Sequence, residues 1–199
     1  MEPIIKKASE LFFAYGVKSI SMDDVAKSSG TSKKTLYQLV ADKNELVDKV
    51  VEGFISCQTE AITPGAFPAK NAVEEVMNQT QSLFSVLSSV NISFFYDLEK
   101  FFPQAWNKLL EHKDKATLPC IVQNLERGIR EDLYRPGLDI PFVAEVRLQQ
   151  ITTALRPDLF AEKNREAQKR MTALTDFYLH AITNAKGRQW IKKLNNENR

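Results

Sequence analysis

The sequence contains few of the residues that build covalent scaffolds or metal centres. Only two of its 199 residues are cysteine and two are histidine, which excludes a disulfide framework and predicts no metal site. The net charge is only +2, so overall charge indicates no partner and any nucleic-acid contact must be local. No apolar run approaches the roughly 18 residues of a membrane span, and the charged N-terminus is unlike a signal peptide. We therefore expect a cytoplasmic protein with no membrane partner.

Glycine and proline are also sparse, at 7 and 8 residues, and no alternating strand pattern persists. Apolar residues recur instead at helical spacing, which predicts an all-α chain. The first helix begins at Pro3 and ends at Gly16. Ser21 is expected to cap a short second helix through a capping box with Asp24, which lies three residues on. Ser32 or Thr31 is expected to cap a third helix that runs to about residue 40.

Longer helices are expected in the rest of the chain. A fourth helix is expected to begin at Asp42 and Glu45, which form another capping-box pair. The stretch 63–68 is the clearest break in the helical pattern. Beyond it we expect helical segments at 69–87, 90–100, 103–131, 139–155 and 161–184. Pro119 should kink or split one of them. The residues from Lys186 onward are expected to form a frayed, solvated end. We expect a three-helix N-terminal domain (1–48) and a larger helical domain (49–199).

The stretch 22–41 fits a helix-turn-helix pattern. Ala26 is small where two helices must approach closely, and Gly30 suits the left-handed backbone of a tight turn. Apolar Val25, Leu36 and Leu39 are spaced to pack the two helices together. The polar residues that remain to face outward are Ser32, Lys33, Lys34, Thr35, Tyr37 and Gln38. Lysines on a first helical turn with no acid nearby suit a reader of the major groove, and the amides of that turn favour phosphate.

Several separated blocks resemble the N-terminal domain of TetR-type regulators over about residues 4–50. These blocks are Ala8, Leu11-Phe12, Gly16, Ser21–Ala26, Gly30, Ser32-Lys33, Thr35–Tyr37 and Lys43–Leu46. Three later segments look similar to Bacteroidetes-type members, namely Leu125–Gly128, Leu133–Pro136 and Ala185–Arg188. The resemblance implies an all-helical homodimer. Its N-terminal domains would bind a near-palindromic operator in double-stranded DNA, and its C-terminal body would bind a small effector and dimerise.

By position, the resemblance implies a set of DNA-binding residues. The residues facing the groove would be Lys33, Lys34, Thr35 and Gln38, next to Ser32. The residues contacting phosphates would be Ser21, Tyr37 and Lys43. Two features depart from the family. Leu39-Val40 replace an aromatic or His-Phe pair, and Lys34 stands where glycine is frequent. Separately, residues 1–52 carry eight lysines against eight acids, which is less basic than expected of a strong DNA binder. A solvated helix start remains the alternative for the lysines, and partial burial against the first helix is the alternative for Tyr37.

Two apolar sets are candidates for the C-terminal functions. Aromatic and apolar residues at helical spacing would line a pocket for a small apolar or aromatic effector, namely Phe84, Leu87, Phe94, Phe95, Leu98, Phe102, Trp106 and Leu109. Their alternative role is core packing. The last two long segments carry apolar stripes that would form a dimer seam, with Val146, Ile151, Leu174, Phe177, Tyr178 and Ala181. Their alternative is packing within one subunit.

The functional prediction is a ligand-responsive DNA-binding transcriptional regulator, most often a repressor in this family. The alternative is the same fold acting as a small-molecule or lipid-binding protein without specific DNA binding. We expect no enzyme, no catalytic residue and no cofactor. The phosphate-binding, dinucleotide-binding, zinc-protease and serine-hydrolase signatures are all missing from the sequence.

Overall fold

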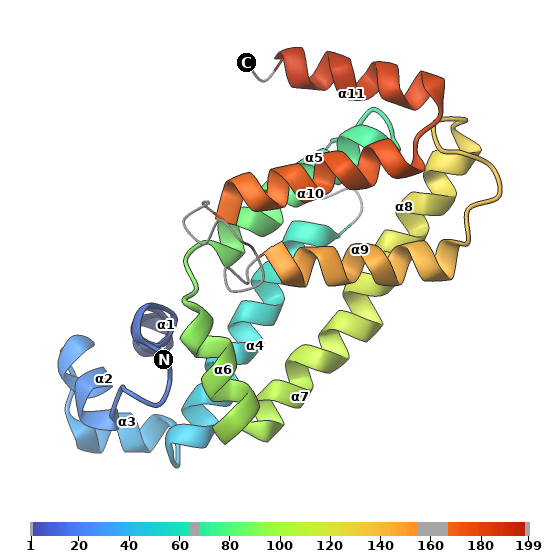
Figure 1. The fold of residues 1–199 in the computed structure, drawn as a ribbon. Coiled ribbons are helices and arrows are strands. Elements are labelled where there is room, and N and C mark those ends of the chain that lie inside the picture. The colour runs from blue at the N-terminus through green and yellow to red at the C-terminus, as the bar shows by residue number, and fades with distance from the viewer. Residues whose placement is uncertain (1, 64–67, 155–166, 198–199) are drawn as a thin grey trace. The chain divides into compact units, whose positions relative to one another are not determined.

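The computed structural model describes residues 2–63, 68–154 and 167–197. Part of the expected break at 63–68 and the start of the expected segment 161–184 lie outside these residues. Within them the fold is all-α, as predicted, and the one β-type contact is an isolated bridge between Tyr134 and Thr183. Figure 1 shows the helices, which are α1 (Glu2–Tyr15), α2 (Met22–Ser28), α3 (Lys33–Leu39), α4 (Lys43–Ile62), α5 (Ala72–Leu87), α6 (Ile92–Phe101), α7 (Pro103–His112), α8 (Leu118–Arg130), α9 (Ile140–Ala154), α10 (Ala167–Ile182) and α11 (Ala185–Glu197).

Local signals set the ends of the first helices. Gly16 follows α1 with a φ of +81°, a conformation that glycine adopts without strain. Ser21 accepts a hydrogen bond from the Asp24 N–H, and the Asp24 carboxylate accepts one from the Ser21 N–H, which confirms the capping box. Ser32 caps α3 by accepting from the Thr35 N–H at 3.0 Å. The sequence therefore predicted these boundaries from short-range chemistry.

The chain packs into two compact units. The first unit comprises Met1–Gln58 and Ser89–Lys113, and the second comprises Thr59–Ser88 and Asp114–Arg199. Helices α6 and α7 therefore pack with the N-terminal helices, and α4 begins in one unit and ends in the other. These two packed units differ from the functional domains predicted from the sequence, 1–48 and 49–199. The division into functional domains stays a prediction.

The first unit is built around one apolar core. Its fully buried side chains include Phe12 of α1, Leu36 of α3 and Leu46 of α4, together with Phe94 and Leu98 of α6. The rings of Phe13 and Phe94 meet edge to face, with centroids 5.0 Å apart, an arrangement that aromatic pairs favour. Helix α6 therefore contributes core to the unit that contains the helix-turn-helix pattern.

The second unit has its own core among α5, α8, α9, α10 and α11. Leu125, Tyr134, Ala144 and Leu179 are buried in it. Tyr134 lies directly against Gly128 of α8, where a Cβ atom would sit 2.1 Å from its ring. Only glycine allows this close approach of ring and helix.

The C-terminal end was predicted as frayed, and this prediction is wrong. Residues 185–197 form α11, whose Ile191 and Leu194 are buried in the core of the second unit. The Asn184 side chain accepts from the Gly187 N–H and so begins the helix. These two apolar residues lie three positions apart and so share one helix face. The charged residues around them made the segment look solvated in the sequence.

Pro119 splits the expected segment 103–131, as predicted. The chain runs through α7, then a π-helical segment η1 (Lys113–Thr117), then α8. Pro119 lies in the first turn of α8, where its missing N–H costs least.

Candidate nucleic-acid interface and effector cavity

Helices α2 and α3 form a compact pair joined by a tight turn. Gly30 in that turn has a φ of +66° and would have open space around a Cβ atom, so the backbone conformation alone requires glycine. The Thr31 N–H donates to the Ala26 carbonyl at 3.0 Å. Val25 and Leu36 are fully buried between the helices. The predicted helix-turn-helix geometry is therefore present in the first unit.

Helix α3 buries one residue and exposes most of the rest. Leu36 points into the core, and Leu39 is half-buried. The structure places the predicted outward-facing residues on a single exposed surface, which comprises Ser32, Lys33, Lys34, Thr35, Tyr37 and Gln38. Such a surface has the donors and the positive charge that base edges and phosphates require. Its contact with DNA stays a prediction.

Two of the side chains predicted to contact DNA, Lys33 and Ser21, already bind carboxylates of α2. Lys33 forms an exposed ion pair with Asp23 of α2, with Nζ and Oδ1 2.8 Å apart. The hydrogen bond to Asp23 raises the pKa of Lys33. Ser21 donates from its hydroxyl to Asp24 at 2.6 Å. A phosphate would have to compete with these carboxylates for both side chains.

Lys43 is more than a surface charge at the start of α4. It is half-buried, and its ammonium donates to the Ile20 carbonyl at 2.5 Å. Burial lowers the pKa of Lys43, and the nearby carboxylates Asp97 and Asp24 oppose that shift. Lys43 therefore anchors the loop before α2, and its predicted phosphate contact would add to this structural role.

The residues predicted to line an effector pocket divide between the two units. Phe94 and Leu98 are fully buried in the first unit. Partly buried Phe95, Phe102, Trp106 and Leu109 pack against the same core. In the second unit, Leu87 is buried and Phe84 is half-buried. Core packing accounts for most of this set, and its role in effector binding stays a prediction.

A cavity lies instead inside the second unit, among side chains that the sequence did not indicate as pocket residues, although two of them, Ile151 and Tyr178, were predicted dimer contacts. The space that the centre of a water molecule can reach in it is about 40 Å³, room for about three waters. Its lining is mostly apolar with a few polar groups, and comprises Ile62, Val76, Gln79, Thr80, Leu83, Thr117, Cys120, Ile121, Asn124, Arg147, Ile151, Met171 and Tyr178. The one available signal in the sequence was a charged residue within the apolar stripe of 139–155.

That charged residue, Arg147 of α9, is only 4% exposed. Its Nη2 donates to the hydroxyls of Thr80 and Thr175, each at 3.0 Å. The guanidinium also lies over the Tyr178 ring, 4.8 Å from the centroid. Burial lowers the pKa of Arg147 to about 10, so the side chain stays charged at neutral pH. Its Nη1 is buried without a hydrogen-bond partner.

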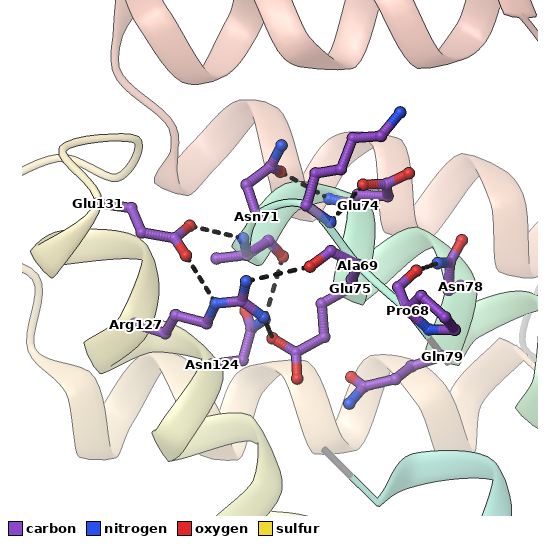
Figure 2. Close-up of polar contacts among 12 residues, drawn as sticks. Pro68, Ala69, Asn71, Glu74, Glu75, Asn78, Gln79, Asn124, Arg127 and Glu131 are labelled. Atoms are coloured by element: carbon purple, nitrogen blue, oxygen red, sulfur yellow. Dashed lines mark hydrogen bonds and ion pairs between the residues drawn. The ribbon is translucent and has the colours of Figure 1, made fainter. Parts of the chain in front are cut away.

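A second polar cluster joins α5 to α8, and Figure 2 shows its side chains converging on the start of α5. Arg127 pairs with Glu75 at 3.0 Å and with Glu131 at 2.7 Å. The Asn124 side chain donates to the Ala72 carbonyl and to Glu75. Arg127 and Asn124 of α8 thus each bind a carboxylate or a carbonyl of the segment that begins α5, so this cluster holds the two helices together.

The predicted dimer residues divide into exposed and buried groups. Val146, Phe177 and Ala181 are exposed, with Phe177 at 67%. Leu174 is half-buried, and Ile151 and Tyr178 line the cavity. Phe142, which sequence reasoning did not select, is also exposed on α9. Helices α9 and α10 thus present apolar side chains outside the core of the second unit.

The histidines and cysteines show no metal-binding arrangement in the described part of the chain, and one cysteine lines the cavity. No group of three or more potential metal ligands occurs among the residues with described positions. His112 is half-buried, and burial lowers its pKa. His180 is exposed and lies 3.4 Å from the Asp176 carboxylate. Cys57 is exposed, and Cys120 is half-buried at the cavity.

None of the helices in the described ranges has the length and hydropathy that crossing a bilayer requires.

An exposed, lysine-bearing helix packed on a second helix through a glycine turn defines a helix-turn-helix module. Residues 4–50 match the family model described as bacterial regulatory proteins, tetR family. Over these residues the chain is therefore similar to that family.

Two curated relatives extend the similarity beyond this domain. The HTH-type transcriptional repressor KstR2 of Mycobacterium tuberculosis is 22% identical over 143 residues, which cover 70% of this chain and 72% of KstR2. The HTH-type transcriptional regulator YvaF of Bacillus subtilis is 33% identical over 125 residues, which cover 58% and 65%.

Solved structures show the same fold over almost the whole chain. A transcriptional regulator from Saccharomonospora viridis, solved in complex with choline, has a TM-score of 0.78 at 16% identity, with 92% and 97% of the two chains covered. A TetR-family regulator from Cytophaga hutchinsonii has a TM-score of 0.71 at 14% identity, with 92% and 94% covered. The chain thus has the fold of a TetR-type regulator.

Proposed function

We propose that this protein is a transcriptional repressor that binds a near-palindromic operator as a homodimer and is released by a small effector. The observation that carries the proposal is the exposed surface of α3, held on α2 by the buried Leu36. In the proposal the groove-facing residues are Lys33, Lys34, Thr35 and Gln38, next to Ser32. The phosphate contacts are Ser21, Tyr37 and Lys43. The name of KstR2 as a repressor supports the direction of regulation. The protein would act in the cytoplasm, where its DNA lies.

A homodimer follows from the symmetry of such an operator. Two recognition helices read two half-sites that lie about 34–36 Å apart or a multiple of that distance. The exposed apolar residues Phe142, Val146 and Phe177 supply a surface that a second copy would cover. Two helices from each subunit would then form a four-helix bundle.

An effector acts by preferring one conformation of the protein. A ligand that binds better to a conformation with the wrong half-site spacing draws the population away from DNA. The cavity of the second unit is the place where we expect it to bind. The choline complex of the Saccharomonospora viridis regulator supports a small-molecule effector for this fold.

The second candidate is a small-molecule-binding protein without specific DNA binding. The observation that favours it is that two of the predicted DNA-contacting lysines already have partners within the protein. Lys33 pairs with Asp23, and Lys43 donates to the Ile20 carbonyl. The N-terminal region also has no net positive charge, with eight lysines and eight acids over residues 1–52.

Fluorescence anisotropy of the pure protein on DNA from around its own gene tests the proposal. The titration is run at two salt concentrations, with an unrelated duplex of equal length as the control. A regulator binds the native segment more tightly and loses affinity steeply with salt, because phosphate contacts release counterions. Equal, weak binding to both duplexes across the whole upstream region would favour the second candidate.

A further inference from the structure

The charge of Arg147 has no counter-charge in the described part of the second unit. Its hydrogen-bond partners, Thr80 and Thr175, are neutral hydroxyls, and Nη1 has no partner. No ion pair joins Arg147 to a carboxylate among the described residues. Glu75, a buried acid of α5, is already bound by Asn124 and Arg127. A buried, unpaired cation is strongly unfavourable in a folded protein, and arginine is rarely buried without an anionic partner.

The position of this charge matches one class of ligand. Arg147 lines the cavity, and its guanidinium presents a planar set of donors that suits a carboxylate. The rest of the lining is dominated by apolar side chains, among them Ile62, Leu83 and Met171. A ligand that satisfies both parts has an anionic head and an apolar tail.

We propose that the cavity of the second unit binds the carboxylate of a short amphiphilic acid, with the Arg147 guanidinium donating to the carboxylate and the apolar tail lying among Ile62, Leu83 and Met171. The binding itself stands independently of the proposed function. Only its regulatory consequence rests on that function.

Because the cavity is small, we expect ligand binding to change the conformation of the second unit. Because the centre of a water molecule can reach only about 40 Å³ of the cavity, we expect a carboxylate to fit there and a longer alkyl chain to exceed the free space. Each added methylene must therefore displace side chains between the helices. Met171 of α10 is a flexible residue that can move in this way. Longer tails thus favour a more open second unit, which is the differential affinity that an effector needs.

Calorimetric titration of the full chain with six-carbon probes tests the proposal. Hexanoate carries the anionic head, hexanol and hexanamide are neutral, and hexyltrimethylammonium is cationic. We expect hexanoate to bind at least tenfold more tightly than the neutral probes and the cation not to bind. A dose-dependent rise in the thermal unfolding midpoint gives an independent readout. Butanoate and octanoate then measure the dependence on tail length.

The matched variant is Arg147→Met, which keeps an elongated side chain and removes the charge. It is expected to fold, because the Thr80 and Thr175 hydroxyls lie 3.4 Å apart and Thr80 also donates to the Val76 carbonyl. The variant should lose the preference for hexanoate while binding hexanol as before. Circular dichroism and the unfolding midpoint confirm that it is folded. Arg147→Lys keeps the charge without the planar fork and should bind hexanoate with intermediate affinity.

Several outcomes would overturn the proposal. These are equal binding of hexanoate and hexanol, no binding of any carboxylate up to 10 mM (about the weak limit of such ligands), or unchanged hexanoate binding by folded Arg147→Met. Tighter binding of hexyl phosphate than of hexanoate would replace the carboxylate by a phosphate. Carboxylate binding that leaves operator affinity unchanged would keep this inference and remove the regulatory role of the cavity.

Discussion

The Asp97 carboxylate of α6 accepts a hydrogen bond from the Lys18 N–H at 2.8 Å, across 79 residues of sequence. Lys18 lies in the turn between α1 and α2. A Cβ atom at Gly16 in the same turn would sit 2.8 Å from the Asp97 carboxylate. Helix α6 therefore braces the turn that leads into the helix-turn-helix module, within a single packed unit.

Removing this carboxylate should destabilise the first unit. Asp97→Ala leaves the Lys18 N–H without its partner, which costs about 1–3 kcal/mol. We expect urea unfolding to show this loss and operator affinity to fall with it. The control is Glu99→Ala, at an exposed position of the same helix, which should change stability by less than about 0.5 kcal/mol. Equal effects of the two variants would contradict the bracing role.

Gly128→Ala should disrupt the second unit. The added methyl would lie 2.1 Å from the Tyr134 ring, which is buried and hydrogen-bonded to Asn124 and so has little freedom to move. Overpacking of this kind costs at least about 2 kcal/mol. Gly53→Ala in α4 is the control, because no atom lies within 4 Å of its Cβ position. Thermal unfolding should show a lower midpoint for the first variant and an equal or higher one for the second.

The double variant Lys33→Ala, Lys34→Ala tests the recognition surface. We expect operator affinity to fall at least about tenfold, because charge and donors are lost at the first turn of α3. Anisotropy at several salt concentrations should also give a shallower dependence on salt. Lys192→Ala, Lys193→Ala removes the same charge from α11 and should leave both quantities unchanged. Unaltered affinity in the α3 variant would rule out this surface as the DNA contact.

Phe177→Glu tests the homodimer. Its ring is 67% exposed on α10, so a charge there is tolerated in a monomer and repelled in an apolar interface between two copies. Light scattering after gel filtration should change from a dimer mass to a monomer mass. Ile92→Glu, at an exposed apolar position of the first unit, should keep the dimer. A Phe177→Glu variant that stays dimeric would place the interface elsewhere.

The sequence predicted best where neighbouring residues act on each other directly. The caps at Ser21 and Ser32, the turn at Gly30 and the break at Pro119 depend on contacts within a few residues, and the structure has all of them. The buried face of α11 escaped prediction, because Ile191 and Leu194 acquire their partners only in the folded second unit.

The sequence by itself determined the all-α class, the helix-turn-helix pattern and the residues exposed on α3, because helical periodicity and capping are local properties. Only the tertiary structure decided that Arg147 is buried without a carboxylate partner among the described residues. Arg147, Thr80 and Thr175 come from three different helices, and nothing in their spacing along the chain brings them together. Burial makes the charge of Arg147 unfavourable without an anionic partner. Burial depends on packing between helices, and no single segment of the sequence determines it.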